Sequence, residues 1–417
     1  MTRAALVGGA ALVTLVPVGR LLSAAAGDGA SARPPPRPPA ASADALESSA
    51  HDLSVTRTVK AAVTPTLKSP LEESALGRSL HWGRDPSTHK SWTPQSLKAA
   101  AVKDPQLATA LRDMLRGAKV GLGTKLVAYP TVHTEGTLPG APSRAQANSA
   151  GHQLDLLYKL AVASRFGAPE LQQSAGAKAA QALTLWAKTY KPTGNPIDEL
   201  RFINVFQAAD LAAPYLSKGQ AKTVQAWTRK FISKGDSFDL IGSEKYNNWN
   251  VWRLAVRGVA AEALGDKAEV LKTRKLLDAE TKIDIRRDGS TYDFHERDAF
   301  HYHLYSLLAY EQLLLLAPQT ISPSVRASVE KAVEFIKPYY LGKKSHVEFK
   351  HTRVGFDRAR AQAGDPEYAP HRWDPADANK ELRLANALFP KVRVWTGKAG
   401  NSPTDFRTVF NETLQER

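Results

Sequence analysis

The densest group of chemically active side chains lies at residues 286–305, which read RRDGSTYDFHERDAFHYHLY. His, Tyr, Arg and carboxylate side chains stand here directly before the apolar run 307–316, which has the length of a buried helix. A second polar group, KYNNWNVWR at residues 245–253, also stands where a helical pattern begins. We interpret the two groups as two walls of one site.

Tyr302 is the strongest candidate for moving a proton. A phenol has a pKa near 10, so it is a poor base unless nearby cations favour the phenolate. Arg297, His301 and His303 are close in sequence, and we expect their charges, with Arg253 from the second group, to lower the pKa of Tyr302. Such a Tyr could both take and return a proton. The alternative interpretation is that Tyr302 is a core residue at a helix edge.

A metal site is not favoured. Residues two apart on a helix point about 200° apart, so His301 and His303 cannot grip one ion together. The sequence holds no HExxH motif and no cysteine, which excludes disulfides, Cys-based zinc sites and Cys nucleophiles. We expect neither a metal nor an organic cofactor.

The second group is rich in amides and aromatic rings. Among Asn247, Asn248 and Asn250, one side chain is enough to cap a helix, so the other two amides need another explanation. Trp249 and Trp252 offer flat faces on which sugar rings stack, although core packing is the better explanation for at least one of them.

The charge of the chain favours a polyanionic partner. Its 417 residues carry a formal net charge of +15, which attracts acidic polysaccharide, nucleic acid or anionic lipid. Lys and Arg are spread along the chain rather than gathered in tracts, so we expect no nucleic-acid partner. The hydrophobic share of 43% is that of an ordinary globular protein, and we expect a monomer.

The first residues resemble an export signal. Residues 1–26 have a basic start, an apolar core and small residues at the end, which is typical of a secretory signal peptide. Residues 27–45 are Pro-rich and predict an extended linker. We expect a secreted or periplasmic protein with no stable membrane association after cleavage, whose residues 46–417 form one catalytic domain.

Helical patterns with Asn, Asp, Pro and Gly at their ends fill most of that domain. We expect a helix beginning at residue 105, followed by helices at residues 148–166, 169–190, 196–216, 218–234, 248–264, 267–283, 297–316, 322–340 and 374–387. Two weak strand signals stand at residues 345–350 and 391–395. Because no 34-residue repeat is present, we favour an all-α fold of the (α/α) toroid or incomplete-barrel type over an open solenoid.

Three segments together resemble the alginate lyase-type polysaccharide lyases. Residues 247–250 (NNWN) are similar to the NNH-type motif of that family, and residues 288–303, from DGS to HYH, are similar to its DGS…R…HYH motif. Residues 339–360, with 373–375 and 385–390, resemble its C-terminal part. The resemblance covers about residues 95–395 and implies an (α/α) toroid that cleaves uronic-acid polymers by β-elimination.

The resemblance also assigns roles. It implies that Tyr302 is the proton-transfer residue and that Arg297 and Asn248 neutralise the uronate carboxylate, so that charge can flow onto it as the C5 proton leaves. The family's His in the NNH-type motif is replaced by Trp249. His152, His301 or His303 are candidates for the missing imidazole, and His301 is included among the catalytic residues.

The expected substrate contacts come from both groups. They are Trp249, Asn250, His152, Tyr246, His303 and Arg253. Because the family's His is absent, glucuronan or another uronate polymer is as good a candidate substrate as alginate. Two other functions remain open: a glycoside hydrolase on an (α/α) barrel, with Asp293, Glu296 and Asp298 as candidate acids, and a non-catalytic polyanion-binding protein.

Overall fold

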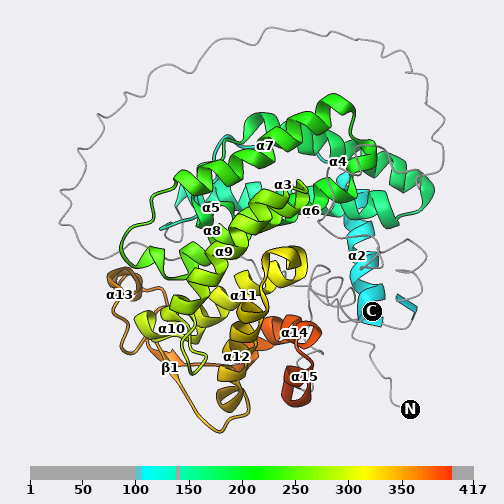
Figure 1. Ribbon diagram of the computed structural model, residues 1–417. Helices are drawn as coiled ribbons and strands as arrows, with labels where there is room; N and C mark the ends of the chain where they lie inside the picture. Colours follow the sequence, from blue (N-terminus) through cyan, green and yellow to red (C-terminus); the bar gives the residue numbers. More distant parts are fainter. Residues whose placement is uncertain (1–100, 103–104, 138–140, 397–417) are drawn as a thin grey trace, which may run out of the picture.

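The computed structural model describes residues 101–102, 105–137 and 141–396 (Figure 1). The expected signal peptide at 1–26, the linker at 27–45 and the first part of the catalytic domain lie outside the described residues. In the part that is described, no helix is long and apolar enough to cross a membrane.

The described chain is almost entirely helical, and the prediction of an all-α fold is confirmed. Its α-helices are α2 (Pro105–Gly121), α3 (Pro142–Phe166), α4 (Pro169–Thr189), α5 (Pro196–Glu199), α6 (Ile203–Leu211), α7 (Lys218–Ser237), α8 (Asn248–Ala263), α9 (Lys267–Asp284), α10 (Tyr292–Arg297), α11 (Phe300–Leu316), α12 (Pro323–Tyr340), α13 (Gly355–Gln362), α14 (Asn379–Leu388) and α15 (Pro390–Thr396). The one sheet in the described residues pairs β1 (Val347–Glu348) with β2 (His371–Arg372) in antiparallel fashion.

Helix starts follow the capping residues of the sequence. Asn247 accepts a hydrogen bond from the Trp249 amide at the start of α8, and Ser217 forms a capping box with Gln220 at the start of α7. Of the three clustered Asn residues, Asn247 is therefore the cap. Asn248 and Asn250 are left for other contacts.

Several expected elements differ from the structure. The helix expected at 148–166 begins earlier, at Pro142, and the one expected at 374–387 is a 3-10 turn, η6 (Pro375–Ala378), followed by α14. The helix expected at 196–216 is divided into α5, a 3-10 turn η2 (Leu200–Phe202), α6 and a second 3-10 turn, η3 (Ala213–Tyr215). The helix expected at 297–316 is broken between α10 and α11 at Asp298, which has a positive φ of 53°. The prediction of a strand at 391–395 is wrong, because these residues belong to helix α15, which begins at Pro390.

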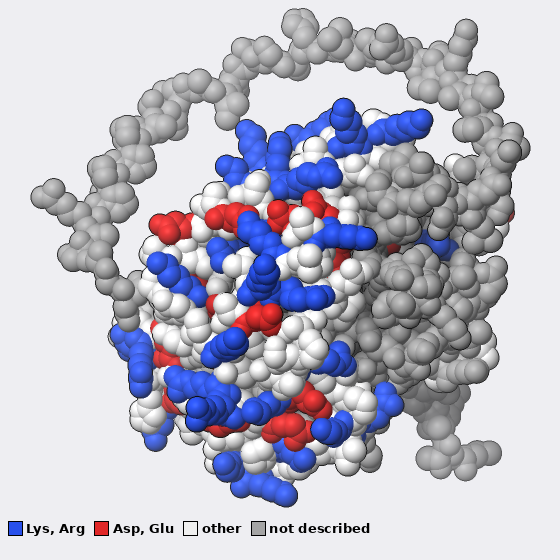
Figure 2. Space-filling model, in the orientation of Figure 1, with Lys and Arg blue, Asp and Glu red and all other residues white. Residues whose placement is uncertain are grey.

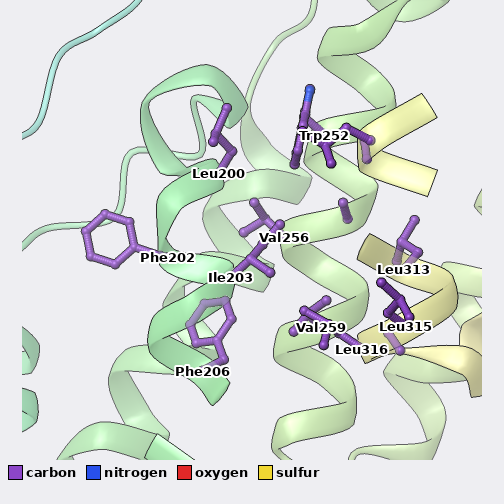
Figure 3. Close-up of a cluster of buried hydrophobic side chains, with 14 of the residues drawn as sticks. Leu200, Phe202, Ile203, Phe206, Trp252, Val256, Val259, Leu313, Leu315 and Leu316 are labelled. Carbon is purple, nitrogen blue, oxygen red and sulfur yellow. The ribbon is translucent and has the colours of Figure 1, made fainter. Parts of the chain in front are cut away.

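Two helices organise the core. Helix α8 packs against α5, α6, α7, α9 and α11, and α11 packs in turn against α10, α12 and α14. Figure 3 shows part of this apolar core, where Val256 of α8 lies beside Ile203 of α6. On the other side of α8, Gly258 packs against Leu313 of α11. Because both polar groups stand at the N-terminal ends of α8 and α11, this core holds them together.

The first and last parts of the described chain also meet. Arg383 Nη1 of α14 donates to Gln106 Oε1 of α2 at 2.5 Å. This contact closes a path of packed helices that runs through α3, α6, α8 and α11. The toroid stays a prediction, and this contact supports it.

Candidate active site

The break between α10 and α11 shapes the site. Asp298 and Phe349 both adopt positive φ, at 53° and 58°, and the Phe349 amide donates to the Asp298 carbonyl at 2.8 Å. The His351 amide donates to Asp298 Oδ2 at 2.9 Å. Left-handed backbone at residues other than glycine is costly and persists where surrounding contacts enforce it. These contacts turn the chain so that Arg297, at the end of α10, faces Tyr302 in the first turn of α11.

Arg297 and Tyr302 are in direct contact. The guanidinium carbon of Arg297 lies 3.8 Å from the centroid of the Tyr302 ring. Arg297 Nη1 donates to Asp357 Oδ1 at 2.5 Å, and Nε lies 3.6 Å from Asp293 Oδ1. Both partners of the stacked pair are buried, with 1% of Arg297 and 2% of Tyr302 exposed. Two carboxylates therefore fix the cation over the phenol ring.

The expected low pKa of Tyr302 is not found. Burial raises the pKa of Tyr302 well above its usual range, and the charge of Arg297 opposes this shift without reversing it. Arg253, which was expected to approach the phenol, donates instead to Asn250 Oδ1 at 2.6 Å. Tyr302 is therefore a protonated phenol at neutral pH.

A second phenol lies at the hydroxyl of Tyr302. The hydroxyl oxygens of Tyr302 and Tyr368 are 3.5 Å apart. The guanidinium carbon of Arg360 lies 4.7 Å from the Tyr368 ring centroid, and Arg360 Nη2 donates to the Thr137 carbonyl at 2.7 Å. Neither Asp357 nor Tyr368 was among the expected site residues. Both lie more than fifty positions away from Tyr302, and the family resemblance of residues 339–360 assigned no role to Asp357.

His301 is the accessible imidazole of the site. Its side chain is 18% exposed, its ring centroid lies 4.9 Å from that of Tyr302, and Nδ1 lies 3.6 Å from Glu367 Oε1. Burial, and then the charge of Arg297, lower the pKa of His301 to about 4. At neutral pH, His301 is therefore an uncharged base beside a protonated phenol.

Asn248 joins the two polar groups. Its amide N–H donates to Asp293 Oδ2 at 2.6 Å and its Nδ2 donates to Asp293 Oδ1 at 2.8 Å. Ser306 also donates to Asp293, and burial raises the pKa of this carboxyl to about 6. Asn248 Oδ1 is buried and has no hydrogen-bond partner among the described residues. One carboxylate thus binds Asn248 of α8 and lies beside Arg297 of α10.

One comparison with known families matches the range that contains these residues. The sequence profile described as alginate lyase matches residues 81–346, which include Asn248, Arg297, His301 and Tyr302. The chain belongs to the alginate lyase family. No curated protein and no solved structure matches it. Asp357 and Tyr368 lie beyond the matched range, although they contact its central residues.

In this alginate lyase family member, two expected substrate contacts are core residues. Trp249 is 2% exposed and stacks on Phe238 with ring centroids 6.3 Å apart, so it presents no face to a sugar. His303 is fully buried between Thr291, 3.1 Å from Nδ1, and the Ala332 carbonyl, 3.0 Å from Nε2. The buried indole of Trp249 and the buried imidazole of His303 therefore cannot take over the role of the family's His.

Asn250 and Arg253 also make internal contacts. Asn250 Nδ2 donates to the Lys245 carbonyl and to Glu280, while its oxygen accepts from Arg253. These bonds anchor the start of α8 to α9. Both amide protons of Asn250 are thereby used inside the protein, so this side chain has no free donor for the expected substrate contact.

The two remaining candidates are exposed. Tyr246 is 40% exposed, with its ring centroid 6.3 Å from that of Tyr292, and so has a face that a sugar can reach. His152 is exposed on α3, and within the described ranges no interaction joins it to Asn248 or Tyr302. The structure thus brings together Asn248, Arg297, His301 and Tyr302, and among the described residues it shows no contact between His152 and these four.

The carboxylates proposed for a hydrolase are poorly arranged for that reaction. Asp293 and Glu296 lie on α10 and Asp298 directly follows it, and Asp293 is fully buried against Asn248. A glycosidase needs two acids on opposite sides of the sugar linkage. In the described part of the chain, no group of three or more His, Asp or Glu side chains is placed to hold a metal ion.

Proposed function

We propose that this protein cleaves a uronic-acid polysaccharide, alginate or glucuronan, by β-elimination. Membership of the alginate lyase family supports a polysaccharide lyase. The observation that carries the mechanism is the triad of side chains in contact: neutral His301, protonated Tyr302 and the Arg297 cation over the phenol ring.

In the proposed reaction, two residues divide the proton transfers. The neutral imidazole of His301 takes the C5 proton of the uronate, and the C5–H electron pair forms the C4=C5 double bond. The C4–O4 bond breaks, and O4 takes the hydroxyl proton of Tyr302. The products are an unsaturated uronate at the new non-reducing end and a free hydroxyl on the departing chain.

Arg297 acts on the phenol rather than on the substrate. Because Arg297 is buried and bound to Asp357, its guanidinium is not available to the sugar carboxylate, which differs from the expected role. Its position 3.8 Å from the Tyr302 ring centroid favours the phenolate that forms when O4 is protonated. The imidazolium of His301 then returns its proton to Tyr302, which restores the starting state.

The charge of the protein suits an acidic substrate. Figure 2 shows one face on which Lys and Arg are numerous, with Asp and Glu between them. The formal net charge of +15 concentrates a polyanion near the surface and speeds its encounter with the site.

The test is a substrate screen. The purified protein is mixed with mannuronate-rich alginate, guluronate-rich alginate, glucuronan, hyaluronan and heparosan, and the ultraviolet absorbance of the conjugated double bond is followed. We expect absorbance to rise with alginate or glucuronan. New reducing ends without that absorbance would show hydrolysis, and binding without new ends would show a polyanion-binding protein.

We also propose that the protein is exported, because residues 1–26 have the pattern of a signal peptide. N-terminal sequencing of protein recovered from the medium or periplasm tests this, and a mature start near residue 27 is the expected result.

A further inference from the structure

Two buried polar atoms stand one helical turn beyond the candidate catalytic residues. Trp252 and Tyr305 are 2% and 3% exposed, and their rings lie 5.4 Å apart between centroids. Neither the indole Nε1 of Trp252 nor the hydroxyl of Tyr305 has a hydrogen-bond partner within the described part of the chain. Figure 3 shows the indole nitrogen pointing away from the apolar cluster around Val256 and Leu313.

The side chains of Trp252 and Tyr305 lie on the same helix faces as Asn248 and Tyr302. Trp252 follows Asn248 by four positions on α8, and Tyr305 follows Tyr302 by three positions on α11. Residues at these spacings are neighbours on one face of a helix. The Tyr302 and Tyr305 ring centroids are 6.4 Å apart. The two unpartnered atoms therefore extend the proposed catalytic surface.

A cation on a third element adds positive charge at the Tyr305 hydroxyl. Arg201 belongs to η2, which packs against α8, and its charge acts on the Tyr305 hydroxyl. The Arg201 guanidinium crosses α3 at Gly151, where a Cβ atom would collide with Nη1. Glycine at position 151 thus leaves the space that the Arg201 side chain occupies.

All three groups offer hydrogen-bond donors. Indole N–H and guanidinium groups can only donate, and burial raises the pKa of Tyr305, so its hydroxyl keeps its proton. A set of donors with one positive charge fits an anion with several acceptor oxygens, and a carboxylate has that chemistry. A neutral sugar, whose hydroxyls both donate and accept, would use such a set poorly.

We propose that Arg201, Trp252 and Tyr305 bind the carboxylate of the uronate that loses its C5 proton. This inference rests on the proposed lyase function and names the groups that take the place of the family's His. Trp249 is packed in the core and Arg297 is bound to Asp357, so neither serves the carboxylate. By drawing charge onto the carboxylate as C5 is deprotonated, the donor set makes that proton more acidic.

Removal of the Tyr305 hydroxyl is expected to affect substrate affinity and fold stability in different ways. A buried donor without a partner lowers stability, so Tyr305→Phe is expected to leave the melting temperature unchanged or raise it. The same variant loses a hydrogen bond to a charged ligand. A residue that only supports the fold would not combine weaker ligand binding with an unchanged or raised melting temperature.

The experiment measures binding without turnover. Calorimetric titrations use the full chain carrying Tyr302→Phe, with tetramers of mannuronate, guluronate and glucuronate, and with the same tetramers after reduction of their carboxyls to alcohols. Adding Tyr305→Phe or Arg201→Gln is expected to weaken binding of the preferred acidic tetramer about tenfold or more, the loss of one charge-assisted hydrogen bond. Affinity for the reduced tetramer is expected to stay the same.

Two further variants sharpen the result. Gly151→Ala displaces the Arg201 guanidinium and is expected to weaken binding of the acidic tetramer as Arg201→Gln does. Tyr310→Phe is the matched control, because the Tyr310 hydroxyl donates to Asp284 at 3.1 Å inside the core. We expect Tyr310→Phe to lower stability and to leave affinity unchanged.

The inference is overturned if Tyr305→Phe and Arg201→Gln leave affinity for the acidic tetramers unchanged, or weaken binding of acidic and reduced tetramers equally. It is also overturned if no acidic tetramer binds. Its failure differs from failure of the lyase function: elimination with an unchanged KM in Tyr305→Phe contradicts only the carboxylate site, whereas carboxyl-dependent binding without elimination by the parent contradicts only the lyase.

Discussion

The guanidinium carbon of Arg297 lies 3.8 Å from the centroid of the Tyr302 ring, across the break between α10 and α11. Asp357 of α13 and Asp293, four positions before Arg297 on α10, hold the cation in this position. Burial keeps the phenol protonated, while the adjacent cation favours the phenolate once the proton has left. The pair is therefore suited to a phenol that gives up its proton during the reaction.

The buried pair between Arg297 and Asp357 is expected to matter for stability. Asp357→Ala leaves a buried guanidinium with one fewer carboxylate, so we predict that the free energy of unfolding in urea falls by about 3–5 kcal/mol. Asp113→Ala is the control, because the Asp113–Arg116 pair is exposed and should contribute less than about 1 kcal/mol. Equal effects of the two variants would contradict the role given to Asp357.

The division of proton transfer predicts a particular pH profile. His301 must be uncharged, so kcat/KM should rise as the pH increases through about 4 and then level off. Tyr302 must be protonated, and its raised pKa predicts no loss of activity on the alkaline side until well above its usual range. Initial rates on the preferred polymer test this. Activity that keeps climbing from neutral into alkaline pH would instead indicate that Tyr302 acts as a phenolate base.

Buried carboxyls predict that stability falls as the pH rises from 6.5 to 8. Burial raises the pKa of Glu199 to about 7 and those of Glu280 and Glu348 to about 8, from an ordinary value of 4.5. The stability that these groups contribute is complete below 4.5 and is lost as the pH rises through their folded pKa values. His301 and His303, with pKa values lowered to about 4, act in the opposite sense but only below 6.5.

Thermal unfolding at a series of pH values tests this expectation. The melting temperature should decrease between pH 6.5 and 8, and Glu280→Gln should flatten the slope because it removes one of the titrating groups. A melting temperature that rises over this range in the parent protein would show that the raised carboxyl pKa values do not govern its stability.

Much of the fold follows from local signals in the sequence. Helices α8 and α7 begin at residues 248 and 218, as expected, after the caps Asn247 and Ser217, and the largely apolar run after Tyr302 forms α11. The break at Asp298 could not be predicted, because a positive φ at a residue other than glycine depends on distant contacts, here with the Phe349 and His351 amides.

For the site too, contacts between neighbours in the sequence could be predicted and contacts between distant segments could not. Arg297 and Tyr302 are five positions apart, so their proximity could be expected from the sequence. Asp357 reaches them from α13, and the charge of Arg201 in η2 acts on Tyr305, although no spacing rule connects such distant segments. The net effect of burial on Tyr302 was also out of reach, because it depends on how completely the surrounding helices exclude water.

The proposed elimination mechanism depends most on proton donation by Tyr302. The decisive measurement is the rate of double-bond formation, followed by ultraviolet absorbance, for the parent and for Tyr302→Phe on the preferred polymer, together with titration of an acidic tetramer into both proteins. We predict that Tyr302→Phe binds the tetramer with the parent's affinity and eliminates at least about 10²–10⁴ times more slowly. A Tyr302→Phe variant that eliminates at the rate of the parent would contradict the proposed mechanism.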